Sequence, residues 1–199
     1  MARKGPVTTD KEQAAVGMAQ IRVGASVAHI GNPYPCLVAA DSIGALAKTS
    51  YKGNTDWLKL ESGFPALEDY VVAIREAASI ECAFKQISPY NMALAHGLDP
   101  TGGSITKIGA GSYSGEVAIG GRVAPTNVRM EAVYTYPNGT NTMTIIFPRA
   151  QVSSAVEMDL PQEEWANVPI TFEAKRADSE TSGGAACWDT QPLGKVAWK

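Results

Sequence analysis

The residues that could carry catalysis or bind a metal are few and lie far apart in the chain. The two histidines, His29 and His96, have no GxSxG, HExxH or paired-cysteine motif around them. Cys36, Cys82 and Cys187 are widely spaced and form no CxxC pair, which predicts reduced thiols rather than disulfides or a zinc site. We therefore expect no metal, no cofactor and no enzyme activity.

Acidic residues cluster at two places, and neither cluster predicts a catalytic pair. Glu68 and Asp69 form one cluster, and Glu163 and Glu164 form the other. Acid–base catalysis needs two carboxylates in one cleft with separated pKa values, whereas carboxylates beside turns are normally solvated. If the chain were an enzyme, Glu68, Asp69 and His96 would be the nearest candidates, and they would have to converge in a cleft.

The composition predicts a folded protein rich in β structure. The 199 residues are 45% hydrophobic and 19% charged, and they include 19 glycines and 12 prolines, so turns are frequent while helix-length patterns are scarce. A formal net charge of -3 offers no general attraction for nucleic acid. The N-terminal segment has basic residues without an apolar stretch behind them, so we expect no membrane insertion and a protein made in the cytoplasm.

The segment 71–86, VVAIREAASIECAFKQ, alternates apolar and polar residues with the period of a strand. Its apolar residues also recur at helical intervals, so a helix remains an alternative. The β-branched residues at 71, 72 and 74 and the lack of a capping residue before Val71 favour a strand. We predict that its apolar face packs on the core of the subunit, its polar face meets water, and its edge pairs with a copy of the same chain.

The other elements follow from the same patterns. Alternation predicts strands at 21–31, 55–62, 127–136, 142–147, 152–160 and 168–176. Ser88 and Gly97 bound a predicted short helix, and Asn138-Gly139 predicts a hairpin. We expect an antiparallel β-sandwich or barrel over 21–177, with one short flanking helix and a long loop or mobile hairpin at 41–55. An N-terminal arm at 1–20 precedes it, and a flexible C-terminal arm with a docking end at 178–199 follows it.

Charged residues on the predicted wet faces of two strands are the candidate functional residues. In the first strand, 71–86, the polar face carries Arg75, Ser79, Glu81 and Lys85, and in the second, 127–136, it carries Arg129 and Glu131. We expect these six residues to face a water-filled lumen or a neighbouring subunit.

The order of these elements resembles the major tail tube proteins of long-tailed bacteriophages. The likeness lies in IRVGASVAHIG, in the long loop through SIGALAKTSYKGNTDWLKL, and in LEDYVVAIREAASIECAFKQISPYNMALAHGL, where a long strand runs into a short helix. It continues through GEVAIGG and NVRMEAVYTYPNG, and covers residues 20–176. The tube protein of type VI secretion shares the architecture of this family.

The resemblance implies a structural virion protein. Such subunits form hexameric rings that stack into a hollow tube around a tape-measure protein, end at a tail terminator and later conduct DNA as a passenger without sequence preference. The segment 71–87 would then line the lumen, and the segment 42–55 would hold the ring-stacking contacts. The candidate stacking residues are Ser42, Lys48, Tyr51, Lys52 and Asn54. The location would be the virion tail, assembled in the bacterial cytoplasm.

A β-sandwich binding module or a capsid-decorating protein is the alternative function, because the same strands could build it. That alternative predicts a compact monomer or trimer without end-to-end stacking.

Overall fold

The computed structural model describes residues 19–62, 67–98, 117, 124–158, 160 and 162–199. Its described strands are β1 (Gln20–Ala25), β2 (Leu46–Ser62), β3 (Leu67–Phe84), β4 (Val128–Thr135), β5 (Thr142–Val152), β6 (Val168–Ala174) and β7 (Lys195–Trp198). The described helices are α1 (Ser26–His29), α2 (Pro89–Ala95) and two 3₁₀ turns, η1 (Ala39–Asp41) and η2 (Ala186–Trp188). The prediction of a mainly β chain with one short flanking helix is therefore confirmed.

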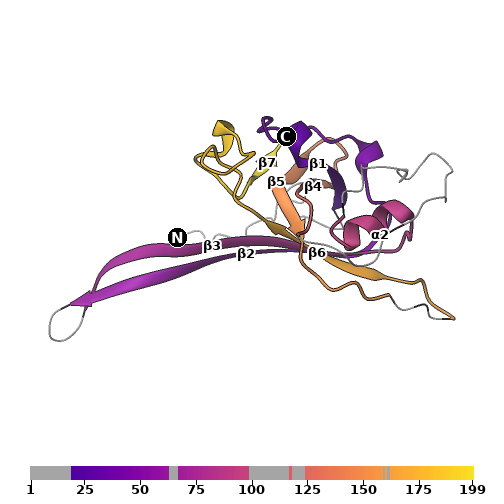
Figure 1. The fold of residues 1–199 in the computed structure, drawn as a ribbon, viewed down its shortest axis with the longest axis horizontal. Coiled ribbons are helices and arrows are strands. Elements are labelled where there is room, and N and C mark those ends of the chain that lie inside the picture. Colours follow the sequence, from indigo (N-terminus) through magenta and orange to yellow (C-terminus); the bar gives the residue numbers. More distant parts are fainter. Residues whose placement is uncertain (1–18, 63–66, 99–116, 118–123, 159, 161) are drawn as a thin grey trace, which may run out of the picture.

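The described strands form one antiparallel sheet in the order β1-β4-β5-β6-β3-β2. The sheet does not close on itself, because β1 and β2 stand at its two ends and do not pair with each other. One edge of β5 is shared: Met143–Ile146 pair with β7, while Ala150–Val152 pair with β6. Figure 1 shows β2 and β3 running side by side far beyond the other strands.

The two faces of the sheet bury separate hydrophobic clusters. The larger cluster joins residues of β1, β3, β4, β6 and α2, among them Ile21, Phe84, Met130, Phe172 and Leu94. The smaller cluster consists of Ile146, Ala177 and Trp188, and it lies where the C-terminal segment covers β5. The C-terminal residues are thus part of the fold.

The helix α2 confirms the expected start and stop signals. The backbone N–H of Asn91 donates to Ser88 Oγ over 3.2 Å, Pro89 occupies the first turn, and Gly97 has the positive φ of 68° that suits glycine after a helix. The buried Asn91 side chain also donates to the carbonyl oxygens of Ile43 and Gln86. These bonds fix α2 against the segment that leads into β2.

The hairpin predicted at Asn138-Gly139 joins β4 to β5. Gly139 has a φ of 72°, and the Asn138 Oδ1 atom accepts from the backbone N–H groups of Thr140 and Asn141. The Tyr136 N–H donates to the Asn141 carbonyl oxygen, which closes the turn. The connection is therefore longer than a two-residue turn, and only the glycine needs positive φ.

Two of the predicted strands differ from the observed strands. The strand from residue 21 stops at Ala25, because the chain bends into α1, where the buried Ser26 Oγ donates to the Pro148 carbonyl oxygen. The strand predicted for 152–160 is absent, because Val152 ends β5, which runs past the predicted end at 147, and the described residues that follow are irregular. There the Ser154 hydroxyl, rather than a backbone carbonyl, accepts the N–H of Thr171.

Two predicted mobile segments are ordered elements instead. Of the two forms expected at 41–55, the loop is wrong from Leu46 onward and the hairpin is the closer description, because β2 begins there and pairs with β3 for its whole length. At 178–199 a flexible arm with a docking end was expected, and the structure has the docked end but no free arm in front of it. Trp188 is fully buried and donates from Nε1 to the Ile30 carbonyl oxygen over 2.6 Å, and β7 adds backbone pairing to β5.

Candidate assembly surface

The hairpin of β2 and β3 is the most exposed regular structure in the described chain. The strands are 17 and 18 residues long and pair with each other throughout. The body supports β3 only through β6, which pairs with Ser79–Phe84. From Ser79 to Leu67 the strand extends by roughly 40 Å at about 3.3 Å per residue. We call the described residues 52–62 and 67–78 the distal hairpin.

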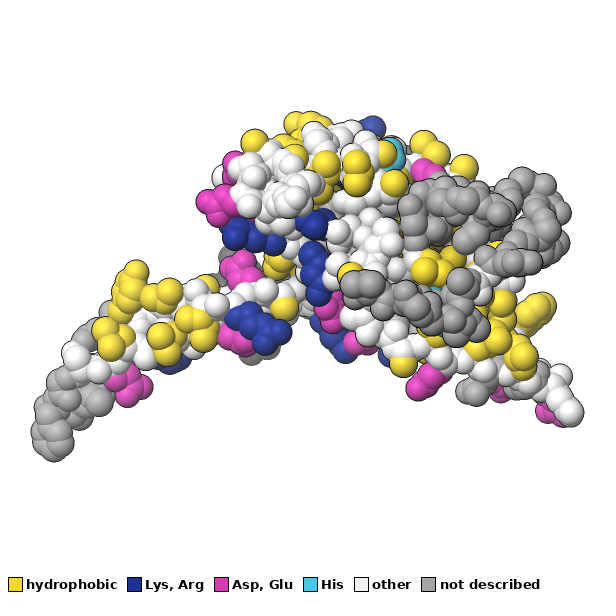
Figure 2. All heavy atoms as spheres, in the orientation of Figure 1, with side chains coloured by type: hydrophobic (Ala, Val, Ile, Leu, Met, Phe, Trp, Pro, Cys, Tyr) yellow, Lys and Arg dark blue, Asp and Glu magenta, His cyan; other side chains and the backbone are white. Residues whose placement is uncertain are grey.

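The projection is large for a chain of this size. A compact chain of 199 residues has a radius of gyration of about 16 Å. The distal hairpin therefore reaches about as far as the body is wide. Its inner end lies against the body, where Ala78 packs on the core and residues 53–55 and 76–78 share a cavity with residues of β5 and β7. Figure 2 shows hydrophobic side chains gathered along this projection.

The outer part of the distal hairpin is apolar on both faces. Leu58 lies opposite Val72 and Leu60 opposite Tyr70, so these four share one face. Their side chains are exposed by 59%, 41%, 60% and 65%, in that order. On the other face Trp57, exposed by 58%, lies opposite Ala73. A contiguous exposed apolar surface of this kind marks a site of protein–protein contact.

Both long edges of the distal hairpin are open in the described chain. β2 is the last strand of the sheet, so its outer edge has no strand partner among the described residues. On β3 the edge facing away from β2 is paired by β6 only from Ser79 onward, so the stretch Leu67–Ala78 is also open on that side. Unpaired N–H and C=O groups on such edges can pair with another chain.

Polar side chains of the hairpin form a few exposed ion pairs. Lys52 Nζ contacts Glu81 Oε1 near the body, and that hydrogen bond lowers the pKa of Glu81. Lys59 Nζ lies 2.7 Å from Glu68 Oε2 near the outer end. Glu61 lies directly opposite Glu68, which places two like charges in register. Exposed pairs of this type contribute little stability, so they do not hold the hairpin in place.

Most of the predicted site residues lie on this one hairpin. The strand prediction for 71–86 is confirmed from Val71 to Phe84, and the helical alternative is wrong. Arg75, Ser79 and Glu81 of β3 face β2 residues Asp56, Lys52 and Ser50 across the register. Lys85 follows β3 and is exposed. The predicted apolar face of β3 is buried in the core at Ile80, Cys82 and Phe84, with Ala78 partly buried against it, and the remaining described residues of that face lie beyond the body.

The predicted stacking residues divide between the hairpin and the body. The exposed or half-exposed positions Lys48, Tyr51, Lys52 and Asn54 all lie on β2. Ser42 precedes the strand and bridges to Arg22 of β1. The structure thus brings the predicted lumen strand and four of the predicted stacking residues together as the two halves of one hairpin.

Arg129 and Glu131 are not wet-face residues, and this prediction is wrong. Both side chains are fully buried, and Arg129 Nε lies 2.8 Å from Glu131 Oε1. Arg129 also donates to the carbonyl oxygens of His29, Asn32 and Tyr34, while Glu131 accepts from the N–H groups of Cys36 and Leu37. The pair anchors the segment 29–37 over β4, because burial is tolerated when every charge finds partners.

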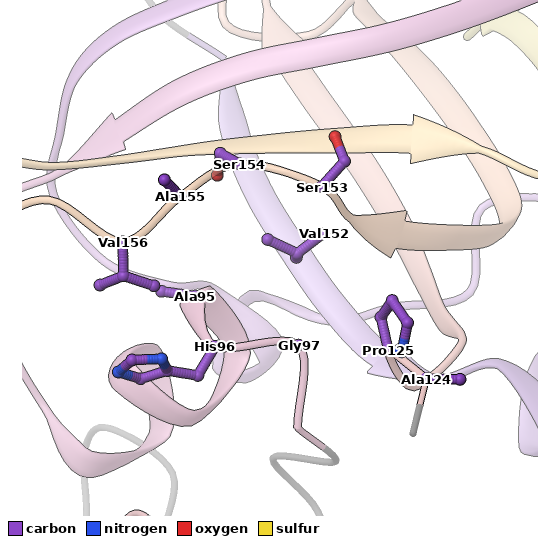
Figure 3. Close-up of a pocket in the computed structure, with 10 residues that line it drawn as sticks. All are labelled: Ala95, His96, Gly97, Ala124, Pro125, Val152, Ser153, Ser154, Ala155 and Val156. Carbon is purple, nitrogen blue, oxygen red and sulfur yellow. The ribbon is translucent and has the colours of Figure 1, made fainter. Parts of the chain in front are cut away.

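The candidate enzyme residues do not converge. Glu68 lies near the outer end of the hairpin, His96 follows α2, and the Asp69 side chain lies outside the described residues. His96 lines a cavity of about 440 Å³ together with Ser153 and Ser154, but its ring points away from both hydroxyl groups (Figure 3). No carboxylate lines this cavity, so its described residues offer no acid–base pair.

The described residues offer neither a metal site nor a helix suited to a bilayer. No group of three or more His, Cys, Asp or Glu side chains in the described ranges could hold a metal ion. None of the described helices has the length and apolar character needed to cross a bilayer.

The apolar end of the hairpin was missed from the sequence, although a signal was present. Trp57, Leu58 and Leu60 on β2, and residues 70–74 on β3, put apolar side chains on both phases of the alternation. Such a segment is either buried on both faces or left to a partner, and here the fold leaves it exposed.

No family model matches the sequence, and no curated protein matches it. Three solved structures are similar in fold. A tail of an empty GTA particle with C6 symmetry has a TM-score of 0.43 and 8% identity, over 91% of this chain and 95% of that chain. The tube terminating cap of the anti-feeding prophage has a TM-score of 0.41 and 11% identity, over 100% and 94%.

The third is the PVC sheath–tube complex of an extracellular contractile injection system in its extended state, with a TM-score of 0.45 and 11% identity over 98% of this chain and 99% of that chain. These neighbours are tail, tube and tube-cap components, the class of protein that the sequence resembles. All three TM-scores are below 0.5, so the likeness concerns the fold alone and the function has to follow from the surfaces of this chain.

Proposed function

We propose that this chain is a structural subunit that assembles with copies of itself into hexameric rings, which stack into a hollow tail tube. The observation that carries this proposal is the distal hairpin, which is apolar on both faces and open on both edges. Such a surface does not stabilise a monomer in water, because exposed strand edges and apolar patches promote uncontrolled association. A closed assembly satisfies both features at once.

The two open edges suit backbone pairing with a neighbour. A strand of a second copy on the edge Leu67–Ala78 would extend the sheet, and repetition of that contact around a ring would close it. The apolar side chains would supply the free energy, since roughly 1.5 to 3 kcal/mol accompanies the full burial of each large aliphatic side chain. The alternation of β3 would then place one face toward a wet lumen.

The proposal assigns roles to the hairpin residues. Arg75, Ser79, Glu81 and Lys85 remain candidates for the lumen or for subunit contacts, and Lys48, Tyr51, Lys52 and Asn54 for contacts between stacked rings. The net charge of -3 suits a channel that DNA passes without sticking. The partners would be a tape-measure protein, a tail terminator and passenger DNA, in a virion tail assembled in the host cytoplasm, and the subunit would have no enzyme activity.

Deletion of the distal hairpin tests this function. Residues 52–62 and 67–78 would be removed with the loop between them, and the strands joined by a short glycine turn. Among the described residues of the deleted part only Ala78 packs on the core, so we expect a folded monomer by circular dichroism and by thermal melting. We expect the full chain to form rings or tubes in electron micrographs and the deleted chain to form none. A full chain that stays monomeric or trimeric at every concentration would instead favour the binding module.

A further inference from the structure

We propose that the outer end of the β2–β3 hairpin docks in a cationic groove beside β7 of a second copy, with Glu61 meeting Lys195. This inference rests on the proposed function, because it names the surface that receives the hairpin. The hairpin end belongs to one protomer and the groove to another. Figure 1 shows the hairpin end far from β7 of its own chain, so a contact within one chain is not possible.

The groove is a cavity of about 540 Å³ at the open ends of β4, β5 and β7. Three cations line it, namely Arg22, Lys195 and Lys199, and no described carboxylate lines it. Arg22 is held by the Gln20 side chain and the Leu37 carbonyl oxygen, which are neutral acceptors. Lys195 Nζ lies 4.8 Å from the centre of the Tyr34 ring. No described Asp or Glu side chain lines this groove, although Lys195 also borders a neighbouring cavity that Glu76 lines.

The walls of the groove are also partly apolar and exposed. Trp198 of β7 is exposed by 67% and Tyr34 by 69%. Both rings remain accessible because β7 is short and its outer edge has no described strand partner. A partner that fits here must present apolar side chains next to a negative charge.

The outer end of the hairpin has this combination. Glu61 and Glu68 stand opposite each other, and Lys59 engages only Glu68. Glu61 therefore has no cation among the described residues, and like charges in register destabilise the isolated hairpin. Leu60 and Tyr70 next to them are exposed by 60% and 65%. An excess of negative charge on one surface and of positive charge on the other is removed when the two surfaces meet.

The contact would be heterologous, since the hairpin end and the groove are different patches of the same surface. Contacts of this kind repeat from copy to copy and form closed rings or open stacks, depending on the rotation between neighbours. The hairpin would thus act as an arm that sets the position of the next subunit.

A charge swap tests the contact. We expect Lys195→Glu, and separately Glu61→Lys, to raise the concentration needed for assembly at least about tenfold, because like charges then face each other. The double variant should return to within about threefold of the native chain. Glu157→Lys is the matched control for Glu61→Lys, because Glu157 is an exposed acid outside the hairpin and the change in net charge is the same. Its assembly should be unchanged.

Carbodiimide cross-linking of mixed ¹⁴N- and ¹⁵N-labelled protein identifies the residues in contact. The expected product joins Glu61 or Glu68 of one copy to Lys195 or Lys199 of the other. Assembly of the native chain with cross-links only at other places, or without sensitivity to the charge swap, would overturn this inference and leave the proposed function standing.

A chain that never assembles and gives no cross-link between copies would overturn both the inference and the proposed function. A groove variant that assembles normally but binds a single-stranded DNA oligonucleotide more weakly than the native chain would assign the groove to nucleic acid instead.

Discussion

Replacing Leu58 and Leu60 together by serine removes two large side chains from one face of the distal hairpin. The two leucines are exposed by 59% and 60% and belong to neither buried cluster. Substitutions at such exposed positions usually change the free energy of unfolding by less than about 0.5 kcal/mol. We therefore expect the double variant to fold as stably as the native chain.

The same change should weaken assembly strongly. Complete burial of a leucine side chain contributes about 1.5 to 3 kcal/mol. The part still exposed in the subunit corresponds to about 1 to 2 kcal/mol per leucine, and so to about 2 to 4 kcal/mol for the pair. At about 1.4 kcal/mol for each factor of ten, the concentration at half assembly should rise about 30- to 700-fold.

Sedimentation velocity over a concentration series measures that midpoint, and urea unfolding measures the stability of the subunit. The matched control is Met158→Ser with Leu160→Ser, since these side chains are exposed by 41% and 70% but lie outside the hairpin. The reasoning is refuted if the hairpin variant assembles at the native midpoint, or if the control shifts the midpoint equally.

Three further experiments, two with substitutions and one on the native chain, test the fold that carries the hairpin. Glu131→Gln should lower the free energy of unfolding, measured by urea denaturation, by about 3 to 5 kcal/mol, because it leaves the buried Arg129 charge without its carboxylate. Almost no change would instead mean that Glu131 is exposed, as in a lumen. Trp188→Ala should cost about 3 to 5 kcal/mol and speed proteolysis within the C-terminal segment, whereas an unchanged cleavage pattern would mean that the segment is not docked. Burial raises the pKa of Cys82 to about 12, so its thiol should resist iodoacetamide at pH 8 until urea unfolds the chain. The free energy of unfolding should fall as the pH rises from about 9 toward 12, because the thiol then ionises more readily in the unfolded chain. Early labelling of Cys82 would contradict its burial.

The parts of the fold that were predictable are those where local patterns and tertiary structure agree. Alternation identified β4 and β6, and Ser88 with Gly97 identified α2, because each pattern reflects a face that the fold then buries. Alternation also identified β3, although the fold buries its apolar face only near Ile80–Phe84. Within β2 the strand predicted at 55–62 is confirmed, but residues 46–54, with a glycine at residue 53 and mixed polarity, were expected to form a loop or a mobile hairpin. β2 is a strand because β3 pairs with it along its whole length, and that pairing is not visible in the segment itself.

The candidate site was predictable in position but not in character. The long strand and the stacking residues lie on the hairpin that we propose as the assembly surface, yet the apolar outer end was not singled out. Arg129 and Glu131 failed for a different reason. A charged pair two residues apart on a strand is typical of a wet face, and only the segment 29–37, which is distant in sequence, supplies the partners that allow its burial.

Electron microscopy of the purified, concentrated chain tests the central claim most directly. We predict six-membered rings with a hollow centre, stacking into tubes, in which the distal hairpin of each subunit lies against a neighbour. Particles that remain single subunits at every protein and salt concentration, with the hairpin free in solvent, would contradict the claim.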